Sequence, residues 1–275
     1  MSTENKKTLE VYNKLASVYL ENIIKHDTKN PAKAKKKRAE IKKIFKRGFS
    51  NLVEGAKILE IGAGDGSSSI ILKELGFNPF PTDVADDFLK AIQESGFKPV
   101  KLNILTDKIE YRYDGALAYR VFVHFTPEDV KMALDKIYDA LVPGGRIVAN
   151  FMNKAAKDNI TSGWFDCSGD HHMGAERYYQ HFDEPKIRRI IESAGFHIVD
   201  FFLFGGQDNN KWFFVAAEKP LGIKSEIFDY IEYEIIPRYK IPGHSNEHIR
   251  QVISRSLNFA DQINRGFSRF RAFSR

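Results

Sequence analysis

Short apolar runs alternate with amphipathic stretches through the middle of the chain. Runs of four to six residues with the composition of buried strands lie at 57–61, 78–82, 99–102, 115–119 and 146–150. In the stretches between them, apolar residues recur at spacings of three and four, which predicts helices over 67–75, 86–95 and 127–141. Alternating strands and helices indicate an α/β fold, with a Rossmann-like, doubly wound and mostly parallel sheet.

The pattern changes on both sides of this core. A helix is predicted over 183–194, and apolar runs at 196–204 and 211–217 flank a polar turn, which predicts an antiparallel hairpin that completes a seven-stranded sheet. Helical spacing also covers residues 1–50, with a break at Asn30-Pro31. We therefore divide the chain into a helical N-terminal flank (1–50), a core domain (51–219) and a helical C-terminal extension (220–275).

Charge is distributed unevenly over these three parts. The chain has 275 residues with a formal net charge of +6, but residues 1–50 carry 14 basic and 5 acidic side chains, whereas residues 51–219 carry 19 basic and 25 acidic ones. The lysines of 33–47 could neutralise phosphates, yet no aromatic residues alternate with them and the chain has no known RNA-binding module. A solvated helix face explains the run better, so nucleic acid is a disfavoured partner that stays open.

Cysteine content and hydropathy bear on the compartment. The single cysteine, Cys167, cannot form an internal disulfide, and the first ten residues, MSTENKKTLE, contain no apolar leader. No run approaches the 18 apolar residues of a membrane span. We expect a cytoplasmic protein with no membrane partner.

The strongest motif is a glycine-rich loop after the first strand of the core, KILEIGAGDG. Glycines let the backbone turn tightly and approach a ligand, and the following helix offers unpaired N–H groups. Dinucleotide binders have G-x-G-x-x-G, whereas the third glycine here comes one residue early. Glu60 would repel a pyrophosphate but suits a ligand that carries an ammonium and a sulfonium. The loop therefore predicts S-adenosylmethionine as cofactor, rather than NAD.

With this motif, residues 8–219 resemble a class I S-adenosylmethionine-dependent methyltransferase. The resemblance implies that the glycine loop lines the methionine part of the cofactor, that Asp83 accepts hydrogen bonds from the ribose hydroxyls, and that Val84 packs on the adenine. Asn103 stands where the family often has Asp, and its carbonyl can still accept from the adenine amino group. The resemblance also implies that the N-terminal helix with the pattern YNKLASVY covers the cofactor, whereas at helical spacing Tyr12 and Tyr19 could equally belong to the core. The cofactor-binding residues implied are Glu60, Gly62, Ala63, Gly64, Gly66, Asp83, Val84, Asn103, Ile104, Tyr119 and Tyr19.

Two residues after the fourth strand are the candidates for catalysis. His124, in VFVHFTPED, is the best general base, because histidine titrates near neutrality; the alternative is a histidine that only caps or packs. Arg120 is unusual at a position that faces the transferred methyl group, and it would pair with a carboxylate or phosphate of the substrate. A salt bridge to a neighbouring acid, such as Asp114, explains it equally well.

The segment between the fifth strand and the next helix is where this family builds its substrate cover. Trp164, His171, Arg177 and Tyr178 are the candidate substrate contacts, with loop packing as the alternative. Adjacent residues rarely share one metal ion, so we predict no metal site at Asp170-His171-His172.

The C-terminal segment resembles the opening of an HD-type phosphohydrolase domain, in which a histidine at the position of His248 is the first metal ligand. The His-Asp doublet of that domain is absent further along, and one histidine cannot assemble a metal site, so we predict no phosphohydrolase activity.

Together these features predict a methyltransferase that acts on an O or N atom of a small, polar or acidic metabolite. Two alternatives stay open: an RNA- or protein-directed methyltransferase that uses the basic N-terminal helix, and a non-catalytic module that only binds S-adenosylmethionine. A homodimer is compatible with the sequence.

Overall fold

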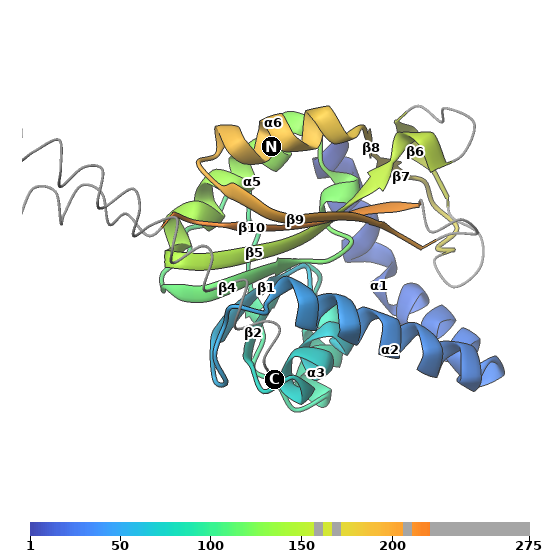
Figure 1. Cartoon of the computed structure of the whole chain (residues 1–275). Coiled ribbons are helices and arrows are strands. Elements are labelled where there is room, and N and C mark those ends of the chain that lie inside the picture. Colours follow the sequence, from blue (N-terminus) through green and yellow to red (C-terminus); the bar gives the residue numbers. More distant parts are fainter. Residues whose placement is uncertain (157–161, 167–171, 206–210, 221–275) are drawn as a thin grey trace, which may run out of the picture. The chain divides into compact units, whose positions relative to one another are not determined.

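A twisted sheet forms the centre of the computed structural model, which describes residues 1–156, 162–166, 172–205 and 211–220 (Figure 1). The strand order is β3-β2-β1-β4-β5-β10-β9, and a further short strand, β8, pairs with the end of β5. The strands are β1 (Lys57–Ile61), β2 (Asn78–Asp83), β3 (Val100–Lys101), β4 (Tyr113–Ala118), β5 (Leu141–Asn153), β8 (His181–Phe182), β9 (His197–Phe204) and β10 (Trp212–Glu218). Strands β1 to β5 pair in parallel, and β10 lies antiparallel between β5 and β9. The predicted fold class is confirmed.

Helices cover both faces of this sheet, as Figure 1 shows. They are α1 (Thr3–Lys29), α2 (Pro31–Gly48), α3 (Ser67–Glu74), α4 (Asp86–Glu94), α5 (Pro127–Ala140) and α6 (Glu184–Ser193), with the short 3-10 helices η1 (Phe122–His124) and η2 (Lys154–Ala156). Residues of α5 and α6 pack in one core cluster, and residues of α2 and α3 pack in another. Because the sheet is buried on both faces, its parallel strands read as continuous apolar runs.

Two details of the sheet differ from the sequence prediction. Pro143-Gly144-Gly145, between the predicted helix over 127–141 and the predicted strand over 146–150, lies inside the long strand β5. Gly144 adopts a φ of 78° and donates its N–H to the Lys219 carbonyl at 2.9 Å, while Gly145 accepts from the Lys219 N–H at 2.8 Å. Pairing with the residue that follows β10 therefore carries the ladder through a segment that looks like a turn.

A separate two-stranded sheet was missed by the sequence pattern. Strands β6 (Gly163–Phe165) and β7 (Arg177–Tyr179) pair antiparallel beside the carboxyl ends of the parallel strands. Their three-residue length is too short for a period of two to be visible in the sequence.

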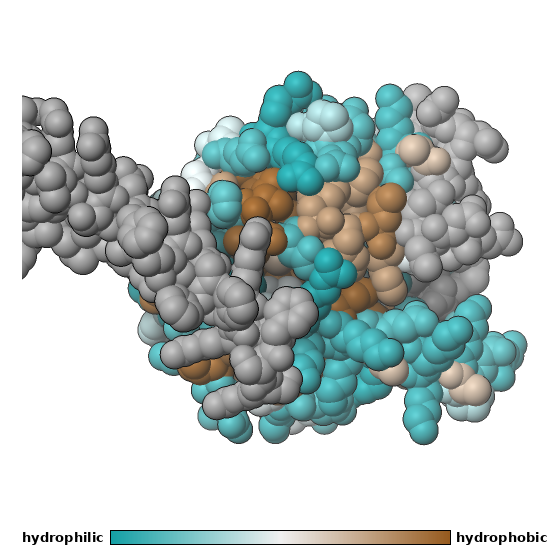
Figure 2. Space-filling view, viewed as in Figure 1, coloured by the Kyte–Doolittle hydropathy of each residue, from teal (hydrophilic) through white to brown (hydrophobic). Residues whose placement is uncertain are grey.

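The basic helix α2 packs by one face and is solvated on the other. Ile41, Ile44 and Phe45 are buried in the core cluster under β4 and β5. On its outer side, Arg38 and Lys42 both contact Glu74, at 2.6 and 3.0 Å. Figure 2 shows the hydrophilic surface along α2 and, above it, a hydrophobic surface over β9 and β10. Part of the lysine run is thus the solvated face of a docked amphipathic helix.

Among the described residues, no helix is both long enough and apolar enough to cross a bilayer. Residues 221–275, which carry the predicted C-terminal helices and the resemblance to a phosphohydrolase, lie outside the described residues.

Candidate functional site

The loop between β1 and α3 has the backbone that its glycines predict. Gly62, Gly64 and Gly66 have φ values of 61°, 56° and 75°, in the left-handed region that disfavours side chains. A Cβ on Gly62 would lie 2.8 Å from a methyl of Val121, whereas a Cβ on Gly64 would point into open space. Gly66 is the N-cap of α3. The loop therefore presents bare backbone to a volume that a ligand could fill.

Glu60 supports this loop from below and does not line the volume above it. Its side chain is 2% exposed, and one carboxyl oxygen accepts a short hydrogen bond from the Ser69 hydroxyl. Burial raises the pKa of Glu60 to about 8, and the Ser69 hydrogen bond offsets part of that shift. Glu60 therefore supports the loop from below, and a contact of Glu60 with the cofactor stays a prediction.

Asp83 closes the same loop from the end of β2. Its Oδ2 accepts the Gly64 N–H at 2.9 Å, and its Oδ1 accepts the Val84 and Ala85 N–H groups at 2.7 and 3.1 Å. Burial raises the pKa of Asp83, while these three backbone donors act in the opposite direction. A carboxylate offers about four lone-pair positions, so roughly one acceptor position stays available on Oδ2.

A cavity of about 420 Å³ lies above the glycine loop and under helix α1. Helix α1 contributes Asn5, Thr8, Leu9, Tyr12 and Tyr19, and the loop after β4 contributes its own residues. Of the predicted cofactor and catalytic residues, those that line the cavity are Gly62, Ala63, Gly64, Asp83, Val84, Tyr19, Tyr119, Arg120 and His124. Gly66, Asn103 and Ile104 do not line it, and Ile104 is buried in the core.

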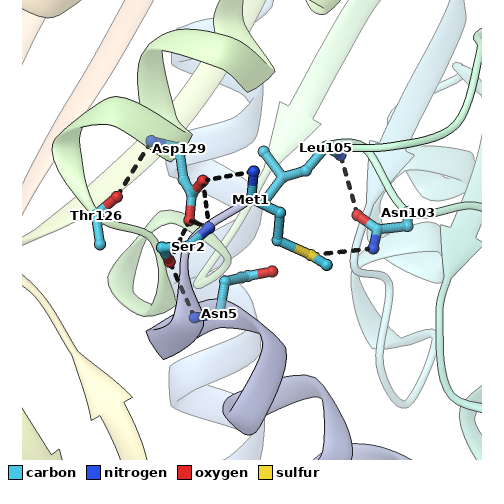
Figure 3. Close-up of polar contacts among 7 residues, drawn as sticks. All are labelled: Met1, Ser2, Asn5, Asn103, Leu105, Thr126 and Asp129. Carbon is cyan, nitrogen blue, oxygen red and sulfur yellow. Dashed lines mark hydrogen bonds and ion pairs between the residues drawn. The ribbon is translucent and has the colours of Figure 1, made fainter.

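Asn103 is engaged in local contacts and in contacts with the start of α1 (Figure 3). Its Oδ1 accepts the Leu105 N–H at 3.0 Å, and its amide donates to the Met1 sulfur at 3.6 Å. The start of α1 is held in turn by Asp129, whose carboxylate accepts the Ser2 N–H at 3.0 Å and the Ser2 hydroxyl at 2.6 Å. The amide oxygen of Asn103 thus already accepts one hydrogen bond, and a contact of Asn103 with the cofactor stays a prediction.

Arg120 lies in the cavity in an unusual backbone conformation. Its φ of 62° makes it the non-glycine residue with a left-handed backbone in the described part of the chain, and its N–H donates to Asn150 Oδ1 at 2.6 Å. The guanidinium lies 5.2 Å from the Tyr119 ring centre and 5.9 Å from that of Trp212. Asp114 lies at the opposite end of β4, roughly 20 Å away at about 3.3 Å per residue, and its carboxylate accepts the Lys57 N–H. Asp114 is therefore not a salt-bridge partner of Arg120, and the alternative of another neighbouring acid stays open.

Both ring nitrogens of His124 are occupied. Nδ1 lies 2.7 Å from the Tyr178 carbonyl oxygen, and Nε2 lies 2.9 Å from the Tyr12 hydroxyl. Burial is the main cause that lowers the pKa of His124 to about 4, and the nearby Arg177 contributes in the same direction. The residue expected to be a general base is therefore neutral and hydrogen-bonded on both sides in this structure.

The candidate substrate contacts lie in a different place from the main cavity. Arg177 is 1% exposed and lies behind Tyr12, and the Tyr178 hydroxyl donates to Gln180 Oε1 at 2.8 Å. Trp164 lines a second, more open hollow of about 610 Å³ between α1 and β6. His171 lies outside the described residues, as do Asp170 and Cys167. Among the described residues, no three His, Cys, Asp or Glu side chains are grouped closely enough to hold a metal ion.

Sequence reasoning did not assign the part of the cavity formed by α2. Lys35, Lys37 and Arg38 line the cavity beside Ile23 and Asp27 of α1. The lysine run was interpreted as a solvated face, and only the packing of α1 against α2 turns some of its members toward the cavity.

Residues 33–200 match the model of a family described as "Methyltransferase domain". No curated protein sequence matches the chain.

Solved structures with the same fold are known. A magnesium protoporphyrin IX methyltransferase from Synechocystis PCC 6803, with bound S-adenosylmethionine, has a TM-score of 0.58 and 15% identity, over 80% of this chain and 98% of that one. An S-adenosylmethionine-dependent methyltransferase from Methanosarcina mazei has a TM-score of 0.52 and 16% identity, over 62% and 96%. A glycopeptide N-methyltransferase in complex with S-adenosylmethionine has a TM-score of 0.53 and 12% identity, over 65% and 93%. At sequence identities of 12% to 16%, the similarity to these structures shows the fold alone.

Proposed function

The chain belongs to the methyltransferase domain family, and we propose that it transfers the methyl group of S-adenosylmethionine to an O or N atom of a small, polar or acidic metabolite. The observation that carries this proposal is the cavity in which the left-handed glycine loop, Asp83 and the loop after β4 face one another. Two of the similar structures contain S-adenosylmethionine by their descriptions, which supports the choice of cofactor.

The residues present fit this cofactor. Gly64 leaves open space where a side chain would stand, so its backbone can approach the methionine part. The available acceptor position of Asp83 suits a ribose hydroxyl, and Val84 and Phe88 offer apolar contacts for the adenine. When bound, the cofactor supplies a methyl group already activated on a sulfonium.

For such an activated carbon, the protein has to position the acceptor, exclude water and leave a path for the departing proton. Helix α1 covers the cavity and contributes seven of its lining residues, so it can exclude water. His124 is neutral with both nitrogens engaged, so in the proposed mechanism it holds its neighbours in place and the acceptor's proton leaves to solvent or to the acceptor's own surroundings.

The charge of the cavity wall favours an acidic acceptor. Arg120 stands beside the loop that faces the transferred group, and Lys35, Lys37 and Arg38 line the wall formed by α2. Guanidinium and ammonium groups recognise carboxylates and phosphates. Three acidic residues, Asp27, Asp65 and Asp83, line the same cavity against four cationic ones. Arg38 is paired with Glu74, so the preference for an acidic acceptor rests mainly on Arg120, Lys35 and Lys37.

Calorimetry with S-adenosylmethionine and NAD tests the cofactor, and a methyl-transfer assay on matched small molecules tests the acceptor. We expect micromolar binding of S-adenosylmethionine and none of NAD. In the assay, aromatic or aliphatic carboxylates and phosphates should be methylated in preference to their uncharged analogues. Binding of NAD alone would overturn the cofactor assignment. Activity on bulk RNA that falls steeply with salt would favour the RNA-directed alternative, and cofactor binding with no turnover on any acceptor would favour the non-catalytic one.

A further inference from the structure

We propose that Tyr12 holds the cover helix α1 closed over the cavity through buried hydrogen bonds, in which His124 accepts a hydrogen bond from the Tyr12 hydroxyl and Arg177 donates one to the Tyr12 oxygen. We call these three residues the latch. This proposal rests on the proposed function for what the cavity binds, but the latch itself is a property of the protein without ligand.

The directions of the hydrogen bonds follow from the acceptor at one end. The Tyr178 carbonyl can only accept, so the His124 nitrogen that faces it at 2.7 Å, Nδ1, must carry the proton. A neutral imidazole has one donor and one acceptor, so Nε2 accepts from the Tyr12 hydroxyl at 2.9 Å. The Tyr12 oxygen then has lone pairs for Arg177 Nη1, which lies 3.3 Å away. Each hydrogen bond of this series therefore has one defined donor and one defined acceptor.

Arg177 anchors the hydrogen-bonded series, because its own position is fixed by burial and by several contacts. A charged side chain that is 1% exposed needs close partners, because removing a charge from water is costly. Its guanidinium lies 5.5 Å from the Tyr12 ring centre and 5.8 Å from that of Tyr179, and Asp166 lies at 3.8 Å. These contacts make Tyr12 a main partner of a buried cation.

The latch joins three elements that lie far apart in the sequence. Tyr12 belongs to α1, His124 to η1 and Arg177 to β7. Further contacts surround the latch: Thr8 Oγ1 accepts the Tyr178 N–H at 3.1 Å, and the Gln180 N–H donates to the Val123 carbonyl at 2.7 Å. Helix α1 is thus attached to β7 at two positions one turn apart, Thr8 and Tyr12.

The position of the latch in the cavity gives it a functional consequence. Tyr12 and His124 both line the cavity, and so do the α1 residues on either side, from Asn5 to Tyr19. Separation of α1 from η1 and β7 would break the Tyr12 hydrogen bonds and widen the opening of the cavity. Tyr12 is therefore a positioning residue, whose loss should speed opening while the glycine loop and Asp83 stay intact.

The experiment compares four variants by hydrogen exchange without ligand and by stopped-flow dissociation of S-adenosylmethionine. Tyr12→Phe keeps the ring and removes the hydroxyl. His124→Ala removes the acceptor, and His124→Gln restores it, because a glutamine amide can donate to the Tyr178 carbonyl while its oxygen accepts from Tyr12. The matched control is Tyr111→Phe, since Tyr111 is 67% exposed. Circular dichroism checks that each variant is folded.

We expect Tyr12→Phe and His124→Ala to raise hydrogen exchange over residues 5–19, and to raise the dissociation rate by roughly tenfold, the scale of one lost hydrogen bond. His124→Gln should recover most of the wild-type behaviour, and Tyr111→Phe should not differ from wild type. A role in bulk stability alone would raise hydrogen exchange throughout the folded core and not over residues 5–19 in particular.

Wild-type exchange over 5–19 in folded Tyr12→Phe would overturn the latch. A His124→Gln variant as impaired as His124→Ala would overturn the role assigned to the imidazole. If wild-type protein does not bind S-adenosylmethionine, the proposed function fails, and the exchange measurement without ligand still decides the latch.

Discussion

The two halves of the site are built in opposite ways. On the cofactor side, the glycine loop, Glu60 and Asp83 come from 24 consecutive residues of one β-α-β unit, and their main contacts are with one another. On the other side, Tyr12, His124 and Arg177 are separated by 112 and by 165 residues when counted from Tyr12. The first half is a local backbone structure. The second exists only when α1, η1 and β7 have packed, so a mutation there should affect stability and opening, whereas one in the first half should affect affinity.

The largest expected effect is on the long-range half. Arg177→Ala removes the largest fully buried side chain and leaves its partners without a cation, and we expect a loss of about 3 kcal/mol in the free energy of unfolding. Chemical denaturation measures it. The matched control is Arg188→Ala, which removes an exposed i,i+4 pair with Glu184 and should cost less than about 1 kcal/mol. Equal losses of unfolding free energy in the two variants would contradict the stabilising role assigned to Arg177 of β7.

The next effect is a pH dependence from the local half. The pKa of Glu60 is raised by burial from 4.5 to about 8, so between these values the folded state holds a proton that the unfolded state has released. Stability from this group is complete below about pH 4.5 and falls as pH rises toward 8, by up to about 1 kcal/mol for each pH unit. Glu60→Gln should flatten this slope, measured by denaturation from pH 5.5 to 7.5. The exposed Glu94→Gln should leave the slope as in wild type.

A smaller effect separates binding from folding on the cofactor side. Asp83→Ala removes the acceptor for the loop amides and for a ribose hydroxyl, which should weaken S-adenosylmethionine binding by about 30-fold, or about 2 kcal/mol. Titration calorimetry measures the change, with Asp87→Ala, on the solvent side of α4, as the control. If Asp83→Ala binds as tightly as wild type, the ribose contact lies elsewhere.

The smallest effect tests whether the second hollow belongs to the cofactor site. Trp164 contacts the Tyr178 ring and lies beneath the Lys7 ammonium, outside the main cavity. Trp164→Ala should therefore change S-adenosylmethionine affinity by less than about twofold, the limit expected for a surface substitution within about 0.5 kcal/mol. A tenfold loss of affinity in calorimetry would show that the second hollow is part of the cofactor site. The two halves of the site would then no longer differ in their effect on binding.

Elements with a strong period were predictable from the sequence. Strand β1 was predicted with its exact bounds, and helices α3, α4 and α5 to within one residue, because apolar spacing and caps such as Thr126 are properties of neighbouring residues. Strand β3 was predicted over 99–102 but has only two residues, since its pairing with β2 is limited to Thr82 and Asp83. The small sheet of β6 and β7 was not predicted, because pairing between segments with weak periodicity depends on the surface they meet.

The residues of the site divide in the same way. The sequence by itself determined the glycine loop, the acidic residue at the end of β2 and the class of cofactor that they suit, because a left-handed turn and a strand end need only local residues. Only the packing of distant segments places Glu60 under the loop and brings Lys37 and Arg38 to the cavity. The same packing sets the Tyr12 hydroxyl within hydrogen-bond distance of His124 Nε2. These are contacts between segments far apart in the chain, and their burial sets which polar groups are charged, which are paired and which face the ligand.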